Sequence, residues 1–159
     1  MHRILELLDK DSNLTEKDIA VMLDLDEREV AAAIAQYKKE GVIVGTKTMI
    51  NWQKTTREFV TAYIELKVTP QFGKGFDQIA ERFYQYEQVK SVFLMSGSYD
   101  LALTVEGSTL TEVALFVAEK LAPMDTVVST ATHFVLKKYK EDGILFEGPV
   151  KDERQVMMV

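Results

Sequence analysis

The sequence predicts an α+β protein in which an N-terminal winged helix-turn-helix precedes a C-terminal ferredoxin-like βαββαβ domain. The first supporting observation is helical apolar spacing as far as Gly41, with capping residues ahead of two of the helices. The second is a change of pattern near Trp52, after which the predicted order is strand, helix, strand, strand, helix, strand. We predict a first domain over residues 1–52, a linker over 53–59, a second domain over 60–140 and a C-terminal extension over 141–159.

Three short helices and a hairpin are predicted in the first domain. Apolar residues at helical spacing mark the first helix, and Thr15 followed by Asp18 is a capping-box pattern that starts the second. Asp26 is the next N-cap candidate, and Gly41 is placed to end the third helix. A hairpin is expected over residues 42–50. The residues predicted to face inward are Ile4, Leu5, Leu7, Leu8, Ile19, Ala20, Leu23, Val30, Ala33, Ile34 and Tyr37.

This order of elements is typical of a winged helix-turn-helix, in which the second helix braces the third. The outer side of the third helix can then enter a DNA major groove, and the hairpin can lie against the backbone. The alternative is a three-helix module that binds another protein, since a fold does not fix a function.

Alternation of apolar and polar residues predicts the strands of the second domain. Residues 60–68, 89–96, 99–106 and 127–140 are the expected strands, and helical patterns follow the first and third. Gly97-Ser98 is the turn between the two central strands. Helices cover one face of such a sheet, so the other face needs a cover. We therefore predict a homodimer through the apolar positions of that face, Phe93, Met95, Ala102 and Ala131.

The composition narrows the classes of function. The chain of 159 residues is 47% hydrophobic and 28% charged, which is typical of a soluble globular protein. It has no cysteine and two histidines, which excludes thiolate catalysis and a multi-histidine metal site within one subunit. We expect no metal and no cofactor. No apolar run approaches the roughly 18 residues of a membrane span, and the start of the chain is no signal peptide. The expected location is the cytoplasm, with no membrane partner.

The whole pattern resembles the leucine-responsive regulatory protein/AsnC (Lrp/AsnC) family, also called feast/famine regulators, from about residue 4 to 140. Residues 14–30 are similar to its helix-turn-helix, and residues 37–43 to its passage from recognition helix to wing. Residues 97–101, Gly-Ser-Tyr-Asp-Leu, are similar to the turn of its sensor domain. The resemblance implies a transcription factor that binds double-stranded DNA, senses a small molecule, often an amino acid, and forms dimers that assemble into tetramers or octamers.

The resemblance assigns the DNA contacts to the third helix. Its middle departs from the family, because Ala33 stands where a basic residue is usual, and residues 1–59 hold nine Lys or Arg against eleven Asp or Glu. We therefore expect weak binding by each DNA-reading head, recovered by linking several heads in one oligomer. Candidate base readers are Arg28 and Gln36, and candidate phosphate contacts are Lys38, Lys39, Lys47 and Lys54.

The resemblance also implies an effector site between dimers. Backbone N–H groups of the Gly97-Ser98 turn suit a carboxylate, and Asp100 suits an ammonium group, so the pair matches an amino acid. The turn can equally be only a turn, with Asp100 bonded to nearby backbone. The candidate effector residues are Gly97, Ser98, Tyr99, Asp100, Thr130 and Thr132, with Ser129 and His133 as further polar positions on the last strand.

Two other functions stay open from sequence alone. Some tetrapyrrole-processing decarboxylases share the two-domain architecture, but they need basic and histidine groups, and only Arg82 and Arg154 are arginines after residue 59. The other is an assembly protein without DNA binding. In the C-terminal extension, residues 144–146 are a candidate edge strand or oligomer contact, and residues 156–159 are unusually apolar for a free tail.

Overall fold

The computed structural model describes residues 2–70 and 75–147, and the chain divides into two compact units, Met1–Ile50 and Asn51–Val159. Each unit is described by itself. The apolar end at residues 156–159 lies outside the described residues. Within the described residues, no helix is long and apolar enough to cross a membrane.

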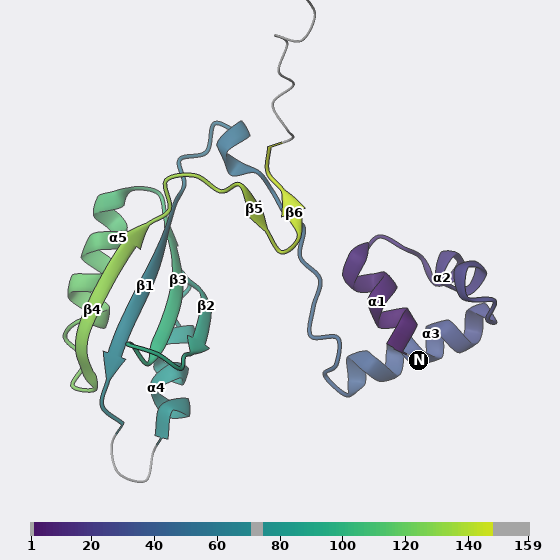
Figure 1. The fold of residues 1–159 in the computed structure, drawn as a ribbon, viewed down its shortest axis with the longest axis horizontal. Coiled ribbons are helices and arrows are strands. Elements are labelled where there is room, and N and C mark those ends of the chain that lie inside the picture. The colour runs from purple at the N-terminus through teal and green to yellow at the C-terminus, as the bar shows by residue number, and fades with distance from the viewer. Residues whose placement is uncertain (1, 71–74, 148–159) are drawn as a thin grey trace, which may run out of the picture. The chain divides into compact units, whose positions relative to one another are not determined.

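Three helices build the first unit: α1 (His2–Lys10), α2 (Glu16–Leu23) and α3 (Glu27–Lys39) (Figure 1). The predicted capping box is confirmed, because the Thr15 hydroxyl accepts the Asp18 N–H and the Asp18 carboxylate accepts the Thr15 N–H. These bonds from Thr15 lower the pKa of Asp18. Most of the predicted inner residues form the core: Ile4, Ile19, Ala20, Val30 and Ile34 are buried, and Leu7, Leu8, Leu23 and Ala33 pack against them. Leu5 and Tyr37 are half-buried and lie outside this cluster.

Gly41 ends α3 as predicted. Its φ of 72° is left-handed, and the Val42 and Gly41 N–H groups donate to the Tyr37 and Lys38 carbonyls. This pair of bonds is a Schellman motif.

The hairpin expected over residues 42–50 is wrong as a pair of strands, because this segment has neither strand nor helix. Val44 is 93% exposed, and only Ile43 packs against the core of the unit. A two-stranded ribbon with so little buried apolar surface is marginal in water.

A four-stranded antiparallel sheet organises the second unit, in the order β2-β3-β1-β4 of the ferredoxin-like fold. Helices cover one face, where side chains of β1 and β3 pack against Ile79, Phe83 and Val113. The elements are η1 (Trp52–Lys54), β1 (Val60–Val68), α4 (Gly75–Tyr84), β2 (Val89–Leu94), β3 (Leu101–Gly107), α5 (Leu110–Phe116), which continues into the π-helical η2 (Val117–Leu121), and β4 (Val127–Phe134).

The last strand is shorter than predicted. β4 ends at Phe134 instead of Lys140, because its one neighbour in the sheet, β1, has only two residues beyond the Ala62–Phe134 pair, where the Thr61 carbonyl accepts the Val135 N–H. The chain then forms a separate small hairpin of β5 (Lys140–Glu141) and β6 (Ile144–Leu145). Residues 144–145 therefore pair with β5 and add no edge to the main sheet.

Candidate DNA-reading helix and effector loop

The outer surface of α3 carries the first candidate site. Val30 and Ile34 hold the inner side of the helix in the core, which turns the opposite side to solvent. Arg28, Ala32, Ala35 and Lys39 are all exposed, at spacings of four, three and four residues. Such spacing places them along one line of the helix. Arg28 and Lys39 therefore lie at the two ends of a line whose middle consists of small alanine side chains.

The other predicted DNA residues lie outside this line, and Lys54 among them lies in η1 of the second unit. Gln36 and Lys38 are exposed on α3, and Lys47 is exposed in the segment after the helix. The Gln36 side-chain amide donates to a Glu40 carboxylate oxygen at 2.5 Å, so Glu40 orients the group that faces solvent. The sequence did not identify this partner.

Acidic groups surround the start of α3. The Asp26 carboxylate accepts the Arg28 N–H at 2.8 Å and so caps the helix, while Glu27 and Glu29 occupy the first turn. These negative charges interact favourably with the positive end of the helix dipole, and they repel the phosphate backbone of DNA. The acidic start has a structural role, and Lys38 and Lys39 supply the positive charge at the other end.

The loop between β2 and β3 carries the second candidate site. The Met95 N–H donates to the Asp100 carbonyl, and the Asp100 N–H donates to the Leu66 carbonyl on β1. The Asp100 carboxylate accepts the Val68 N–H at 2.8 Å, at the register shift of the β1–β4 ladder. One carboxylate oxygen of Asp100 therefore has a backbone partner, and Gly97 and Ser98 at the tip are exposed.

Tyr99 anchors the same loop to the sheet. Its hydroxyl lies 3.2 Å from the Tyr63 hydroxyl of β1. The hydrogen bond with Tyr99, together with burial, raises the pKa of Tyr63 to about 12. Tyr63 thus stays neutral over the physiological range, and its contact with Tyr99 links the loop to β1 in the sheet.

Thr130 and Thr132 lie apart from the loop within one chain. They are half-buried on β4 and pair with Leu66 and Ile64, whereas the loop leads into β3 on the other side of β1. Two strand spacings, about 10 Å, separate β4 from β3. Within one chain, β1 therefore lies between the two sets of predicted effector residues.

A hollow of about 270 Å³ lies at the opposite end of β3, lined by residues that include Arg57, Glu106 and Gly107. None of the predicted effector residues lines it.

The uncovered face of the sheet carries the residues predicted for a dimer contact. Ladder partners place Phe93, Ala102, Glu65 and Ala131 in one row across four strands. Phe93 is 53% exposed and Ala131 is exposed, while Ala102 between them is buried by its neighbours.

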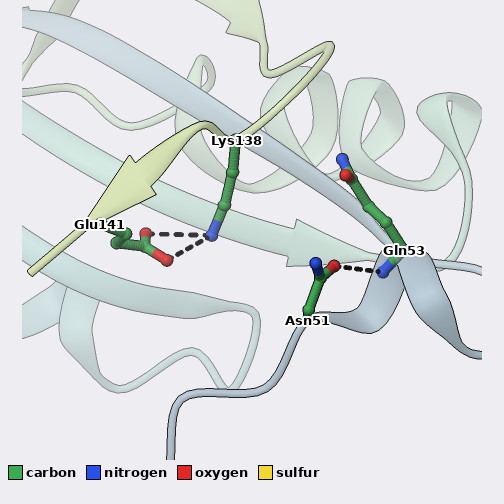
Figure 2. A network of polar contacts seen from close by, with 4 residues as sticks. All are labelled: Asn51, Gln53, Lys138 and Glu141. Atoms are coloured by element: carbon green, nitrogen blue, oxygen red, sulfur yellow. Dashed lines mark hydrogen bonds and ion pairs between the residues drawn. The ribbon is translucent and has the colours of Figure 1, made fainter. Parts of the chain in front are cut away.

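The sequence interpretation missed one feature, the contact between the linker and the C-terminal hairpin. Asp142 and Gly143 both have positive φ, which is the backbone of a type I′ turn. An Asp-Gly pair is a strong hairpin signal, so this turn was predictable. Figure 2 shows the polar groups on the two segments, Asn51 with Gln53 and Lys138 with Glu141.

Comparison with known proteins identifies both units. A winged helix-turn-helix DNA-binding family matches residues 2–44, and the Lrp/AsnC ligand-binding domain matches residues 61–145. The uncharacterized HTH-type transcriptional regulator YugG of Bacillus subtilis is 48% identical over 155 residues, which cover 97% of this chain and 93% of YugG.

Solved structures share the fold. A transcriptional regulator of Neisseria meningitidis in complex with L-Met matches with a TM-score of 0.70 at 19% identity, over 87% of this chain and 88% of that one. AsnC of Escherichia coli matches with a TM-score of 0.66 at 16% identity, over 87% and 91%.

Proposed function

The chain belongs to the Lrp/AsnC family of HTH-type transcriptional regulators, and from this premise we propose that α3 reads duplex DNA while the 95–100 loop takes part in binding an amino acid effector. The observation that carries the DNA assignment is the exposed line of Arg28, Ala32, Ala35 and Lys39. Arginine suits guanine edges and lysine suits phosphate, and small alanines let the helix approach thymine methyl groups. A regulator that binds DNA acts where the DNA is, so the proposal includes a cytoplasmic location.

Gel shifts on the promoter region of the protein's own gene test the DNA assignment. Lys39→Ala removes a phosphate contact, so it should weaken binding to all sequences alike and reduce the salt slope by about 0.9. Arg28→Ala should weaken binding to the preferred site about 10-fold or more relative to unrelated DNA. Lys10→Ala, an exposed lysine at the end of α1, is the matched control and should leave both quantities unchanged. Failure of the parent protein to bind DNA at low salt would favour the assembly-protein alternative.

The effector assignment is supported by the free acceptor capacity of Asp100 and by the exposed Gly97-Ser98 backbone. The L-Met complex of the Neisseria meningitidis regulator supports an amino acid as the ligand class. Thr130 and Thr132 of a neighbouring subunit complete the proposed site, so ligand binding is linked to assembly. We propose a homodimer through the uncovered sheet face, which assembles further into tetramers or octamers.

Calorimetry against the amino acids tests this site, and the choice of variant matters. Asp100→Ala leaves the Val68 N–H without its acceptor, which costs about 1–3 kcal/mol of stability and obscures the result. Asp100→Asn keeps a carbonyl oxygen for Val68 and removes only the charge. We expect Asp100→Asn to fold normally and to lose at least 10-fold in affinity for the amino acid that binds the parent. Equal affinity of both proteins would remove Asp100 from the site.

A further inference from the structure

The described chain ends by returning to the residues where the second unit begins. The Asn51 side-chain amide donates to the Phe146 carbonyl at 3.0 Å, between positions 95 residues apart. The same side chain accepts the Gln53 N–H at 3.2 Å and caps η1 (Figure 2). Asn51 therefore joins the linker to the C-terminal hairpin, which we define as residues 138–147.

Aromatic contacts fold the linker into a compact piece behind this bond. The Arg57 guanidinium lies 4.5 Å from the centre of the Trp52 ring and 5.8 Å from that of Phe59. The two rings lie 6.2 Å apart. Cation–π contacts of this kind hold residues 52–59 together without a regular ladder.

The C-terminal hairpin is itself braced. Its Asp142-Gly143 turn is type I′, and the Phe146 N–H donates to the Tyr139 carbonyl at 3.0 Å. The Lys138 ammonium bonds both carboxylate oxygens of Glu141 at 2.9 and 3.0 Å (Figure 2). These bonds fix the conformation of the hairpin and so hold the Phe146 carbonyl in position to accept the bond from Asn51.

Charge acts on the hairpin as well. The Lys137 ammonium lies 2.8 Å from a Glu147 carboxylate oxygen and lowers the pKa of Glu147, and the charge of Lys54 in the linker lowers it to a lesser extent. Hydrogen bonding and charge thus act between the same two segments.

We propose that the C-terminal hairpin clasps the linker and thereby limits the reach of the DNA-binding unit. This inference rests on the proposed function. With the clasp closed, the first unit is connected to the linker by residues 42–50, which form neither helix nor strand. Released and extended, residues 51–59 could span up to about 30 Å, at roughly 3.3 Å per residue, and the reach grows by the difference between this length and the distance that the folded linker spans. Because the upper bound is close to one turn of DNA, clasp closure restricts which half-site spacings two linked heads can occupy.

A conservative variant isolates the clasp bond. Asn51→Asp keeps an oxygen to cap η1 but loses the amide that donates to Phe146. Gln53→Glu adds the same charge two residues away on an exposed side chain and is the matched control. Trp52 is the only tryptophan in the sequence, so its fluorescence reports on this segment directly. We expect acrylamide quenching of Trp52 to rise about twofold, and amide exchange in 52–59 and 144–147 to quicken about three- to tenfold, in Asn51→Asp and not in Gln53→Glu.

A distance measurement tests the reach without DNA. The sequence has no cysteine, so Ser12→Cys on the first unit and Glu119→Cys on the second allow specific labelling for energy transfer, diluted with unlabelled protein. Asn51→Asp should lengthen and broaden the distance distribution relative to Gln53→Glu. Equal quenching or equal distributions in the two variants overturn the clasp.

DNA with paired half-sites then tests the consequence. When one helical turn of DNA is inserted between the half-sites, both variants should bind more weakly. We expect the loss of affinity to be at least threefold smaller for Asn51→Asp than for Gln53→Glu. The same spacing dependence in both variants overturns the limit on reach. Loss of all DNA binding in the parent, with the distance change intact, overturns the proposed function and leaves the clasp itself supported.

Discussion

At the scale of single residues, the Tyr63–Tyr99 contact makes a measurable prediction. The pKa of Tyr63 is raised to about 12, so the neutral phenol is the form that the folded state favours. The stability from this contact is complete below the unfolded pKa of about 10 and is lost as pH rises through 12. Spectrophotometric titration should show one of the six tyrosines ionising near 12, and Tyr99→Phe should move it towards 10. A Tyr99→Phe titration identical to that of the parent would contradict the contact.

Gly107 gives a second prediction at this scale. A Cβ atom at Gly107 would lie 2.9 Å from Cγ2 of Val113, a buried and stiff side chain. Gly107→Ala should therefore lower the free energy of unfolding of the second unit by about 1–3 kcal/mol, measured by urea denaturation. Gly97→Ala is the control, because nothing lies within 4 Å of its Cβ position. The double variant Gly107→Ala with Val113→Ala should cost less than the sum of the two single changes.

At the scale of elements, local patterns predicted most of the fold. The alternation over residues 60–68 gave the bounds of β1, and Thr15 and Asp26 gave the starts of α2 and α3. The errors at β4 and at residues 42–50 have one cause: the existence of a strand depends on what lies beside it. Neither the point at which β4 runs out of β1 to pair with nor the exposure of Val44 can be derived from the neighbouring letters.

The candidate sites divide in the same way. Exposure of Arg28 and Lys39 followed from helix periodicity, because the inner side of α3 was clear from the sequence. The bonds from Asp100 to Val68 and from Asn51 to Phe146 join positions 32 and 95 residues apart. Residue spacing carries no signal for such contacts, so they required the folded chain.

The start of α3 makes a prediction about an element. Asp26→Ala removes the cap on the Arg28 N–H and should destabilise the first unit by about 1 kcal/mol. Asp26→Ser keeps a capping oxygen and removes the charge, so it should retain stability and tighten DNA binding at low salt, because the carboxylate repels phosphate. Thermal unfolding and gel shifts measure the two effects separately. Unchanged DNA affinity in Asp26→Ser at low salt would place the start of α3 away from the DNA backbone.

At the scale of the whole molecule, the acidic balance of the DNA-binding unit supports the proposal that several units bind DNA together. The seven Lys and Arg of residues 2–50 face ten Asp and Glu, so a single unit gains little from phosphate neutralisation. Linking several units raises the effective concentration of the second head once the first is bound. We therefore expect the proposed subunit contact through the uncovered sheet face to contribute to DNA affinity together with α3.

Phe93→Glu tests this dependence. It places a charge in the row that Phe93 forms with Ala102, Glu65 and Ala131, where desolvation and like charge both oppose a contact with a second copy. We expect sedimentation to show a shift to monomer and gel shifts to show a loss of about 10²-fold in affinity for a paired site, with little change for a single half-site. Tyr84→Glu, at the 60% exposed end of α4 on the covered side of the sheet, is the control and should keep the dimer. If Phe93→Glu is still a dimer, the subunit contact lies on another face. If Phe93→Glu is a monomer and binds the paired site as tightly as the parent, one α3 is sufficient for binding.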